Sequence, residues 1–441
     1  MSNASLELQD KIDNRTATVG IVGMGYVGLP LAVAVFDAGF SVIGFDVDEN
    51  KIQHLSSGTS YMEHLGSDFA KDFVDSDRFV GTTIAADLVS ADIISLCVPT
   101  PLGPQNEPDL TYVLDSTREV AKILRRGQLV VLESTTYPGT TRDEMLPILE
   151  ESGLKHGEDF FLAYSPERED PGRKSETTQT IPKLVGGIDE TSGSLAHAFY
   201  SAVVDNAHLV SSAEVAESAK LLENIYRAVN IALVNEMKLI LDKLGIDIWE
   251  VVDAAATKPF GFQPFYPGPG LGGHCIPIDP FYLTWKAQEA GMPTRFIELA
   301  GEINQKMPEI VVDRVASALN EDGKPLKNAK VLVVGIAYKP DVDDVRETPA
   351  ATIIDDLHNR EAKVAYHDPH LLKFPKMRKH DIKLSSVPLT AESVAAFDAV
   401  LIITNHTNID WSLIAMHAQL VIDTRNVLAS CPEIRCRIVK A

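Results

Sequence analysis

The stretch GIVGMGYVGLPLAVAVFDAGFSVIGFD, residues 20–46, restricts the fold of this chain more than any other segment. An apolar, β-rich run at residues 19–22 leads into a glycine turn at 23–28, and an apolar helical segment then ends near Gly39. A second apolar run at residues 41–45 stops at Asp46. Strand, tight turn, helix and strand in this order predict a βαβ unit of a parallel sheet.

The glycines of the turn have the G-x-G-x-x-G spacing of a dinucleotide site. Gly23 would make the turn, Gly25 would let a pyrophosphate approach the backbone, and Gly28 would let helix and strand pack closely. Asp46, eighteen residues after Gly28, would accept the ribose hydroxyls and repel a 2′-phosphate, which favours NAD over NADP. The alternative is a glycine turn without a ligand. The predicted cofactor site comprises Gly23, Met24, Gly25, Tyr26, Val27, Gly28 and Asp46.

Further residues join this site because the alternation of strands and helices continues to about residue 170. Ligands of an open parallel sheet lie at the carboxyl ends of its strands. The apolar runs of residues 91–101 and 127–135 therefore place Pro99, Thr100 and Thr135 near cofactor or substrate, although either threonine could cap a helix instead. Lys51, just beyond Asp46, is either a phosphate ligand or a solvated lysine.

The stretch FFLAYSPERED reads as a further strand that ends at Glu167 and Arg168, which the same argument brings to this edge of the sheet. We assign both residues to the substrate site, and Glu167 and Thr135 also to catalysis. A solvated charged pair is the alternative for Glu167 and Arg168.

Composition limits the classes of partner. A chain of 441 residues should divide into two or three domains, and its net charge of −22 argues against nucleic acid. No apolar run is long enough for a membrane span, and four cysteines without a C-x-x-C pair make no disulfide framework. We therefore expect a cytoplasmic protein with reduced thiols and no metal site. An anionic ligand would need a local cluster of Lys and Arg.

Helical periodicity runs from a capping signature at Ser211 to Gly245. A helix of this span is roughly 48 Å long, so we expect it to link two domains and to form a homodimer interface. Lys220, Asn224 and Arg227 fall on one face of it, at i, i+4 and i+7. A solvated stripe is the common explanation of such spacing, but a lysine four residues before a neutral asparagine is no salt-bridge pair. We expect the three side chains to converge on a ligand.

Residues 259–280 form a long loop without periodicity that contains the sequence GPGLGGHCIPIDP. A long loop in a compact domain is commonly functional. Cys275 precedes a helix predicted to start near Asp279, whose N-terminal dipoles would lower the pKa of the thiol. The alternative is an inert, buried cysteine. From the same loop we assign Tyr266, Gly268 and Gly272 to the substrate site.

The last third of the chain again reads as strand, loop and helix. Of the G-x-G-x-x-G pattern seen in the first third, only one glycine, Gly335, is present here. Thr348 is predicted to cap a helix that starts at Pro349. Lys339, Arg346 and Arg425 fall in strand-end loops, where they bind an anion or are surface charges. We assign Lys339 and Arg425 to substrate and Arg346 to cofactor.

The predicted fold is α/β, with two doubly wound, Rossmann-like parallel-sheet domains joined by a long central helix. We expect an NAD-binding domain at residues 1–210 and a central helical dimerisation domain with the cysteine loop at 211–320. A second doubly wound domain with a mononucleotide-like ligand is expected at 321–441, and the family resemblance described next implies that this ligand is a UDP-sugar.

The chain resembles the UDP-glucose/GDP-mannose dehydrogenase family over nearly its whole length. The resemblance rests on GMGYVG, SPER, the K-x-x-x-N-x-x-R pattern of residues 220–227, GPGLGGHCIPIDP and AYKPDVDDVRE. It implies a four-electron oxidation of a sugar C6 alcohol to a carboxylate with two NAD⁺. Cys275 would form a thiohemiacetal and then a thioester. Water activated near Asp279 or Glu167 would release the acid.

In this scheme Lys220 and Asn224 stabilise negative charge on the substrate oxygen. The first general base stays open between Lys220 and a water held by Asp279. The cysteine loop is most similar to that of the family's UDP-N-acetylglucosamine enzymes, which supply surface polysaccharide precursors. UDP-N-acetylmannosamine enzymes are the close alternative. His274 and Arg168 point to an N-acetylated sugar.

Three other functions fit the sequence less well. A single-hydride 3-hydroxyacid dehydrogenase shares the first domain and a Lys-x-x-x-Asn pair, but it leaves the cysteine loop and the third domain unexplained. Tyr282 and Lys286 match an epimerase pattern by chance, outside the first nucleotide fold. A non-catalytic NAD-sensing module would show no turnover.

Overall fold

The computed structural model describes residues 2–62, 65–103, 107–168, 177–273, 276–377 and 379–441. It divides into two compact units, the first made of residues 1–223 and 281–292 and the second of residues 224–280 and 293–441. The three-domain division therefore stays a prediction. Within the described residues no helix combines the length and the apolarity needed to cross a membrane.

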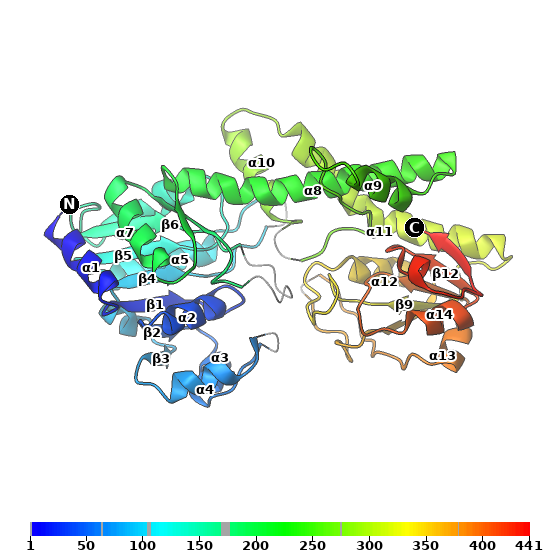
Figure 1. The fold of residues 1–441 in the computed structure, drawn as a ribbon, viewed down its shortest axis with the longest axis horizontal. Helices are drawn as coiled ribbons and strands as arrows, with labels where there is room; N and C mark the ends of the chain where they lie inside the picture. Colours follow the sequence, from blue (N-terminus) through cyan, green and yellow to red (C-terminus); the bar gives the residue numbers. More distant parts are fainter. Residues whose placement is uncertain (1, 63–64, 104–106, 169–176, 274–275, 378) are drawn as a thin grey trace. The chain divides into compact units, whose positions relative to one another are not determined.

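The first unit is built on a sheet of eight strands in the order β3-β2-β1-β4-β5-β6-β7-β8 (Figure 1). Neighbouring strands run parallel except β6 and β7, which are antiparallel. The strands are β1 (Thr18–Val22), β2 (Ser41–Phe45), β3 (Phe79–Thr82), β4 (Ile93–Leu96), β5 (Gln128–Leu132), β6 (Phe160–Tyr164), β7 (Lys183–Gly187) and β8 (Ala207–Leu209).

This sheet is apolar on both faces, as parallel sheets covered by helices are. In β1, Val19 and Ile21 belong to one buried cluster, whereas Val22 belongs to the cluster on the opposite face. The helices of this unit are α1 (Asn3–Asp13), α2 (Gly28–Asp37), α3 (Glu49–Ser56), α4 (Asp68–Val74), α5 (Thr111–Ile123), α6 (Leu146–Glu150), α7 (Glu190–Ser201) and most of α10 (Asp279–Glu289). A 3₁₀ turn at Ala85–Ser90 and a π-helical turn at Thr140–Met145 complete it.

Helix α1 was not predicted. Its apolar positions Ala4, Leu8 and Ile12 are buried in the same cluster as the inner face of α7, so they extend the first core. Lys11 of α1 lies 2.8 Å from Asp92, and Arg125 lies 2.7 Å from the same carboxylate. Burial opposes the charge on Asp92, but its hydrogen bonds to Arg125 and Lys11 hold the pKa of this carboxyl below its usual value. The ion pair of Lys11 with Asp92 thus attaches α1 to the residue just before β4 at neutral pH.

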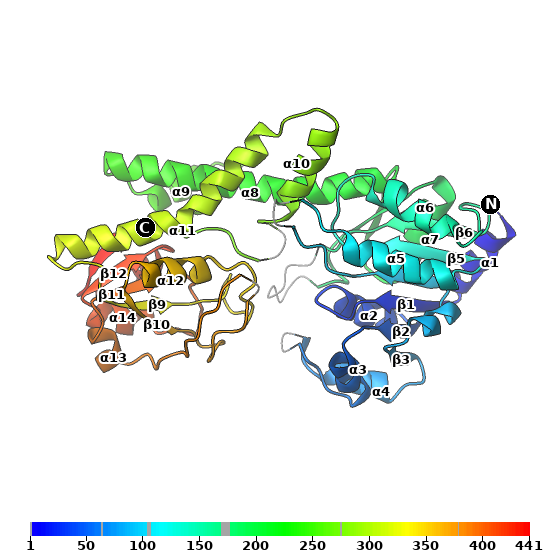
Figure 2. The same cartoon turned by 180° about the vertical axis from the view of Figure 1, so that it is seen from behind.

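The second unit has a five-stranded, fully parallel sheet in the order β10-β9-β11-β12-β13. Its helices α11 and α12 lie side by side (Figure 2). Thr348 caps α12 by accepting a hydrogen bond from the Ala350 N–H, and Pro349 opens the helix, as predicted. The elements are α9 (Ile248–Ala256), α11 (Arg295–Glu321), β9 (Lys330–Val334), α12 (Pro349–Asn359), β10 (Lys363–His367), α13 (Ala391–Ala395), β11 (Ala399–Ile402), α14 (Trp411–His417), β12 (Leu420–Asp423), a 3₁₀ turn at Val427–Ser430 and β13 (Arg437–Lys440).

The predicted long helix is α8 (Ala213–Leu244), the long green helix of Figure 1. Two parallel-sheet α/β units and a long central helix confirm the predicted fold class. One face of α8 carries exposed apolar side chains at positions 222, 226, 233, 240 and 244, with exposed fractions between 46% and 66%.

Candidate active site

The glycine turn of the first unit joins β1 to α2, as predicted. Gly23 has a φ of +93°, which favours glycine, and its N–H donates to the Phe45 carbonyl at 2.8 Å. A Cβ on Gly28 would lie 1.8 Å from the Gly23 carbonyl oxygen, so this position requires glycine for packing. A Cβ on Gly25 would meet nothing within 4 Å. The backbone at Gly25 thus has the open space into which the prediction places a pyrophosphate.

Asp46 follows β2 and holds the turn in shape. Its carboxylate accepts hydrogen bonds from the Met24 N–H at 2.8 Å and the Asp48 N–H at 2.9 Å. Lys51 donates to the same group at 2.7 Å, a role that neither prediction for this lysine included. These three bonds leave acceptor capacity on a carboxylate with about four lone-pair sites. The residues present therefore fit an adenosine ribose at Asp46.

The two glycines give a matched test of this site. We expect Gly25→Ala to leave the thermal unfolding temperature near that of the wild type but to weaken NAD binding by about tenfold or more, because the added methyl occupies the approach to the backbone. Gly28→Ala should instead lower the unfolding temperature, because its methyl overlaps the Gly23 carbonyl. Calorimetric unfolding and NAD titration measure both. Unchanged NAD affinity in Gly25→Ala contradicts the assignment.

The strand ends beyond the turn bring further predicted residues to the same edge of the sheet. Pro99 is exposed, Thr100 is buried and Thr135 is half-buried. Neither threonine caps a helix, because α5 begins after Leu110 and the π-helical turn begins after Gly139. The Thr100 carbonyl accepts a hydrogen bond from the Tyr282 hydroxyl. Contact of Pro99, Thr100 and Thr135 with cofactor or substrate stays a prediction.

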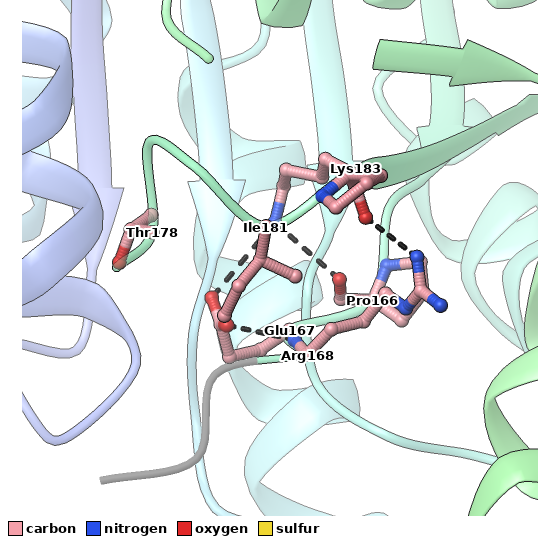
Figure 3. A pocket seen from close by; sticks show the side chains of 7 residues that line it. Pro166, Glu167, Arg168, Thr178, Ile181 and Lys183 are labelled. Carbon is pink, nitrogen blue, oxygen red and sulfur yellow. Dashed lines mark hydrogen bonds and ion pairs between the residues drawn. The ribbon is translucent and has the colours of Figure 1, made fainter. Parts of the chain in front are cut away.

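Glu167 and Arg168 follow β6 and line a pocket with Pro166, Thr178, Ile181, Pro182 and Lys183 (Figure 3). The Arg168 N–H donates to Glu167 Oε1 at 2.7 Å. The Arg168 guanidinium lies 2.6 Å from Glu223 and donates to the Pro182 carbonyl at 2.5 Å. The two side chains are therefore half-buried and hydrogen-bonded, which replaces the alternative of a solvated pair.

The three polar residues predicted to converge on a ligand, Lys220, Asn224 and Arg227, differ in burial on α8. Lys220 and Asn224 are 7% and 4% exposed, whereas Arg227 is exposed. Among the described residues Lys220 forms no ion pair. An ammonium held out of water without a counter-charge is costly unless a ligand supplies the charge.

Asn224 has a partner within the second unit. Its amide donates to Asp279 Oδ2 at 2.6 Å, and Asp279 is 3% exposed. Two residues that are 55 positions apart and were both predicted to be catalytic are thus in direct contact. Cys275 and His274 lie outside the described residues.

The glycines before Cys275 pack against the second unit. A Cβ on Gly268 would lie 2.6 Å from a guanidinium nitrogen of Arg425, and one on Gly272 would lie 2.7 Å from the Cβ of Tyr338. The Gly268 N–H donates to Asn235 at 3.0 Å, and the Gly273 N–H donates to the Arg346 carbonyl at 2.9 Å. This close packing gives the glycines a structural role that the sequence prediction did not include; their contact with substrate stays a prediction.

The remaining basic residues lie at strand ends of the second unit. Burial lowers the pKa of Arg425 to about 10, and its guanidinium donates to the Ile403 carbonyl at 2.9 Å. Arg346 is paired with Asp344 at 2.6 Å, and Lys339 lies over the Tyr338 ring. Tyr266 is half exposed and donates to Asp253 at 2.7 Å. Their roles toward substrate or cofactor stay predictions.

At the end of β10, Asp368 takes the place that Asp46 has after β2. Gly335, after β9, has a φ of +80° and donates to the His367 carbonyl at 2.9 Å, which reproduces the Gly23 turn. The carboxylate of Asp368 accepts from the N–H groups of residues 336, 337, 370 and 371 and lies 3.1 Å from His406 Nε2. It is fully buried.

Comparison with known proteins covers the three parts of the chain. Residues 17–204 match the NAD binding domain of the UDP-glucose/GDP-mannose dehydrogenase family, residues 214–306 its central domain, and residues 332–430 its UDP binding domain. The chain belongs to this family. It is thus an NAD-dependent nucleotide-sugar dehydrogenase, with a nucleotide-sugar substrate.

Relatives within the dehydrogenase family include enzymes for two different sugars. The chain is 35% identical over 391 residues to UDP-N-acetyl-D-glucosamine 6-dehydrogenase of Pseudomonas aeruginosa, covering 88% of this chain and 90% of that protein. It is 41% identical over 352 residues to protein CapL of Staphylococcus aureus, covering 79% and 81%. The solved UDP-N-acetylmannosamine dehydrogenase structure from Pyrococcus horikoshii aligns with a TM-score of 0.86 at 31% identity, covering 96% and 99%.

Sequence reasoning missed Glu217, a residue of this dehydrogenase that holds the segment after Thr135. Glu217 is buried on α8 and accepts from the Gly139 N–H at 2.7 Å and from both the N–H and hydroxyl of Thr141, which fixes the segment after Thr135. Its position one turn before Lys220 was the available signal. Tyr282 is fully buried, and Lys286 pairs with Glu289, so neither is arranged as in an epimerase.

Proposed function

We propose that this dehydrogenase oxidises the C6 alcohol of UDP-N-acetylglucosamine to UDP-N-acetylglucosaminuronic acid, a precursor of surface polysaccharide. The observation that carries the proposal is the buried contact between Asn224 and Asp279, on the same helical face as the buried Lys220. A buried cation one helical turn from an amide that contacts a carboxylate suits a reaction that develops negative charge on a sugar oxygen.

The side chains of the site have the following roles in the proposed reaction. Lys220 and the Asn224 amide stabilise the oxygen that develops at C6, while Asp279 orients Asn224 and holds a water. The Cys275 thiolate adds to the C6 aldehyde and holds it covalently until water releases the acid. Bound NAD⁺ would supply the oxidising chemistry, two electrons at each of two stages. Glu167, at the end of β6, is the second candidate to activate the water.

Two arguments support the proposed substrate: the cations needed to bind its diphosphate, and the residues expected to contact its sugar. The chain carries a net charge of −22, so a UDP-sugar must be held by local cations. The proposed cluster is Arg168, Lys220, Arg227, Lys339 and Arg425. Arg168 and His274 support an N-acetylated sugar. The solved UDP-N-acetylmannosamine dehydrogenase structure, to which the chain is similar, supports UDP-N-acetylmannosamine as the alternative.

We also propose that the enzyme is a homodimer through α8. The exposed side chains Leu222, Tyr226, Leu233, Ile240 and Leu244 recur at intervals of four or seven residues along one face. A seam with this spacing fits a second copy of the same helix. Contiguous exposed apolar surface of this kind commonly marks a protein interface.

A panel of UDP-sugars assayed for NADH tests the function. We expect turnover with UDP-N-acetylglucosamine and two NADH for each sugar consumed, with a carboxylate product identified by mass spectrometry. Turnover confined to UDP-N-acetylmannosamine changes the sugar but keeps the chemistry. One NADH per sugar favours a single-hydride dehydrogenase, and binding of NAD without any turnover favours a sensing module.

A further inference from the structure

Titratable side chains that the proposed mechanism does not use converge beneath the turn that carries Glu167. Glu133 follows β5, Lys183 begins β7 and Tyr200 lies on α7, all in the first unit. The Lys183 ammonium lies 2.6 Å from Glu133 Oε2, and the Tyr200 hydroxyl donates to the other oxygen of Glu133. Glu133 and Tyr200 are fully buried, and the side chain of Lys183 is 5% exposed. The sheet thus encloses a complete ion pair.

A buried ion pair is a poor device for stability alone, because desolvation offsets most of the Coulomb attraction. The presence of this pair in the core therefore suggests a role that apolar residues of the same volume would not have. The role can be inferred from the other contacts of Lys183. Its ammonium group has three N–H donors, and Glu133 uses only one of them.

The remaining contacts of Lys183 are with the turn after β6. Its ammonium lies 3.4 Å from the Pro166 carbonyl oxygen and 3.9 Å from Glu167 Oε2 (Figure 3). Burial alone would lower the pKa of Lys183, but the carboxylates of Glu133 and Glu167 raise it above its usual value. The two carboxylates therefore favour the charged form of the lysine beneath Glu167. Cys97, nearby, is a buried thiol whose pKa is raised by burial and by Glu133, so it adds no charge.

We propose that Lys183 is a positioning residue that acts through Glu167. Glu133 and Tyr200 fix the ammonium, and the ammonium fixes the Pro166 carbonyl and the carboxylate of Glu167 at the edge of the pocket. This inference rests on the proposed function, in which Glu167 contacts the substrate and activates water. It assigns the buried ion pair to the reaction rather than to folding.

The decisive variant is the double substitution Lys183→Met with Glu133→Gln. Lys183→Met alone leaves Glu133 buried and unpaired, which destabilises the fold. The double variant removes both charges, and glutamine keeps an acceptor for Tyr200. We expect it to unfold near the wild-type temperature and to bind NAD normally, with kcat lowered about 10- to 100-fold, as for lost orienting partners of functional groups. A double variant with wild-type kcat overturns the proposal.

A second experiment tests whether the loss of kcat in the double variant depends on Glu167. In a Glu167→Gln background the same double substitution should lower kcat no further, because residues that act as a unit are not additive. Full additivity overturns the proposal. Should the double variant fail to fold, Tyr200→Phe removes only the hydroxyl that fixes Glu133. It should lower kcat severalfold at unchanged KM for NAD, and an unchanged kcat counts against the proposal.

These measurements separate the positioning role from the proposed function. A wild-type enzyme that oxidises no UDP-sugar contradicts the function itself. A wild type with turnover and a folded double variant that keeps it contradict only the role of Lys183.

Discussion

The Cys275→Ser enzyme is expected to form carboxylate at least about a thousandfold more slowly than the wild type, while its affinity for NAD stays unchanged. A serine hydroxyl is a far weaker nucleophile than a thiolate, so the aldehyde would not be captured as a covalent adduct. The measurements are carboxylate by mass spectrometry and NAD affinity by titration. The NADH yield per sugar should fall from two to one or less.

Cys436→Ser is the matched control, because Cys436 is a half-buried cysteine of the second unit whose pKa is raised mainly by burial. It should keep wild-type kcat. Full carboxylate production by Cys275→Ser would falsify covalent catalysis, and an equal loss in both variants would point to a general effect of thiol replacement.

Replacing Lys220 with methionine should lower activity without lowering stability. Methionine keeps most of the volume but removes a buried ammonium that has no ion-pair partner among the described residues. We expect kcat/KM to fall about 10²- to 10³-fold, the usual loss when a donor to a developing oxyanion is removed. The unfolding temperature of the ligand-free enzyme should stay equal or rise, because the desolvation cost disappears.

The control for Lys220 lies on the same helix. Lys243 is exposed in the last turn of α8, so Lys243→Met removes the same charge without touching the site. Its kcat/KM should remain within about twofold of the wild type, as for most surface substitutions. Retention of more than half of the wild-type kcat/KM by Lys220→Met argues that the lysine is structural.

Local signals in the sequence predicted the elements well. The apolar run at residues 41–45 coincides with β2, and the helix predicted between Ser211 and Gly245 is α8. Thr348 and Pro349 start α12 as expected. These predictions succeeded because turn glycines, caps and hydrophobic periodicity act between neighbours in the chain. Helix α1 was missed, since its pattern is short and its burial depends on α7.

Contacts between distant residues could not be predicted in the same way. Glu133 and Lys183 are 50 residues apart, and each alone reads as an ordinary surface charge. The pairing of Asn224 with Asp279 likewise needed the fold, although both residues had been singled out. Gly268 and Gly272 had been assigned to the substrate site, but their close packing against Arg425 and Tyr338 could be seen only in the fold.

Asp46 and Asp368 follow equivalent glycine turns in the two units, but their carboxylates differ in how many hydrogen bonds they already accept. Asp46 accepts three hydrogen bonds and keeps a lone pair for a sugar hydroxyl, whereas the five donors around Asp368 exhaust its acceptor capacity. The carboxylate of Asp368 therefore has no acceptor left for a ribose hydroxyl, whereas the carboxylate of Asp46 has one. The acid after the second glycine turn is thus fully used in holding that turn, whereas the acid after the first is not.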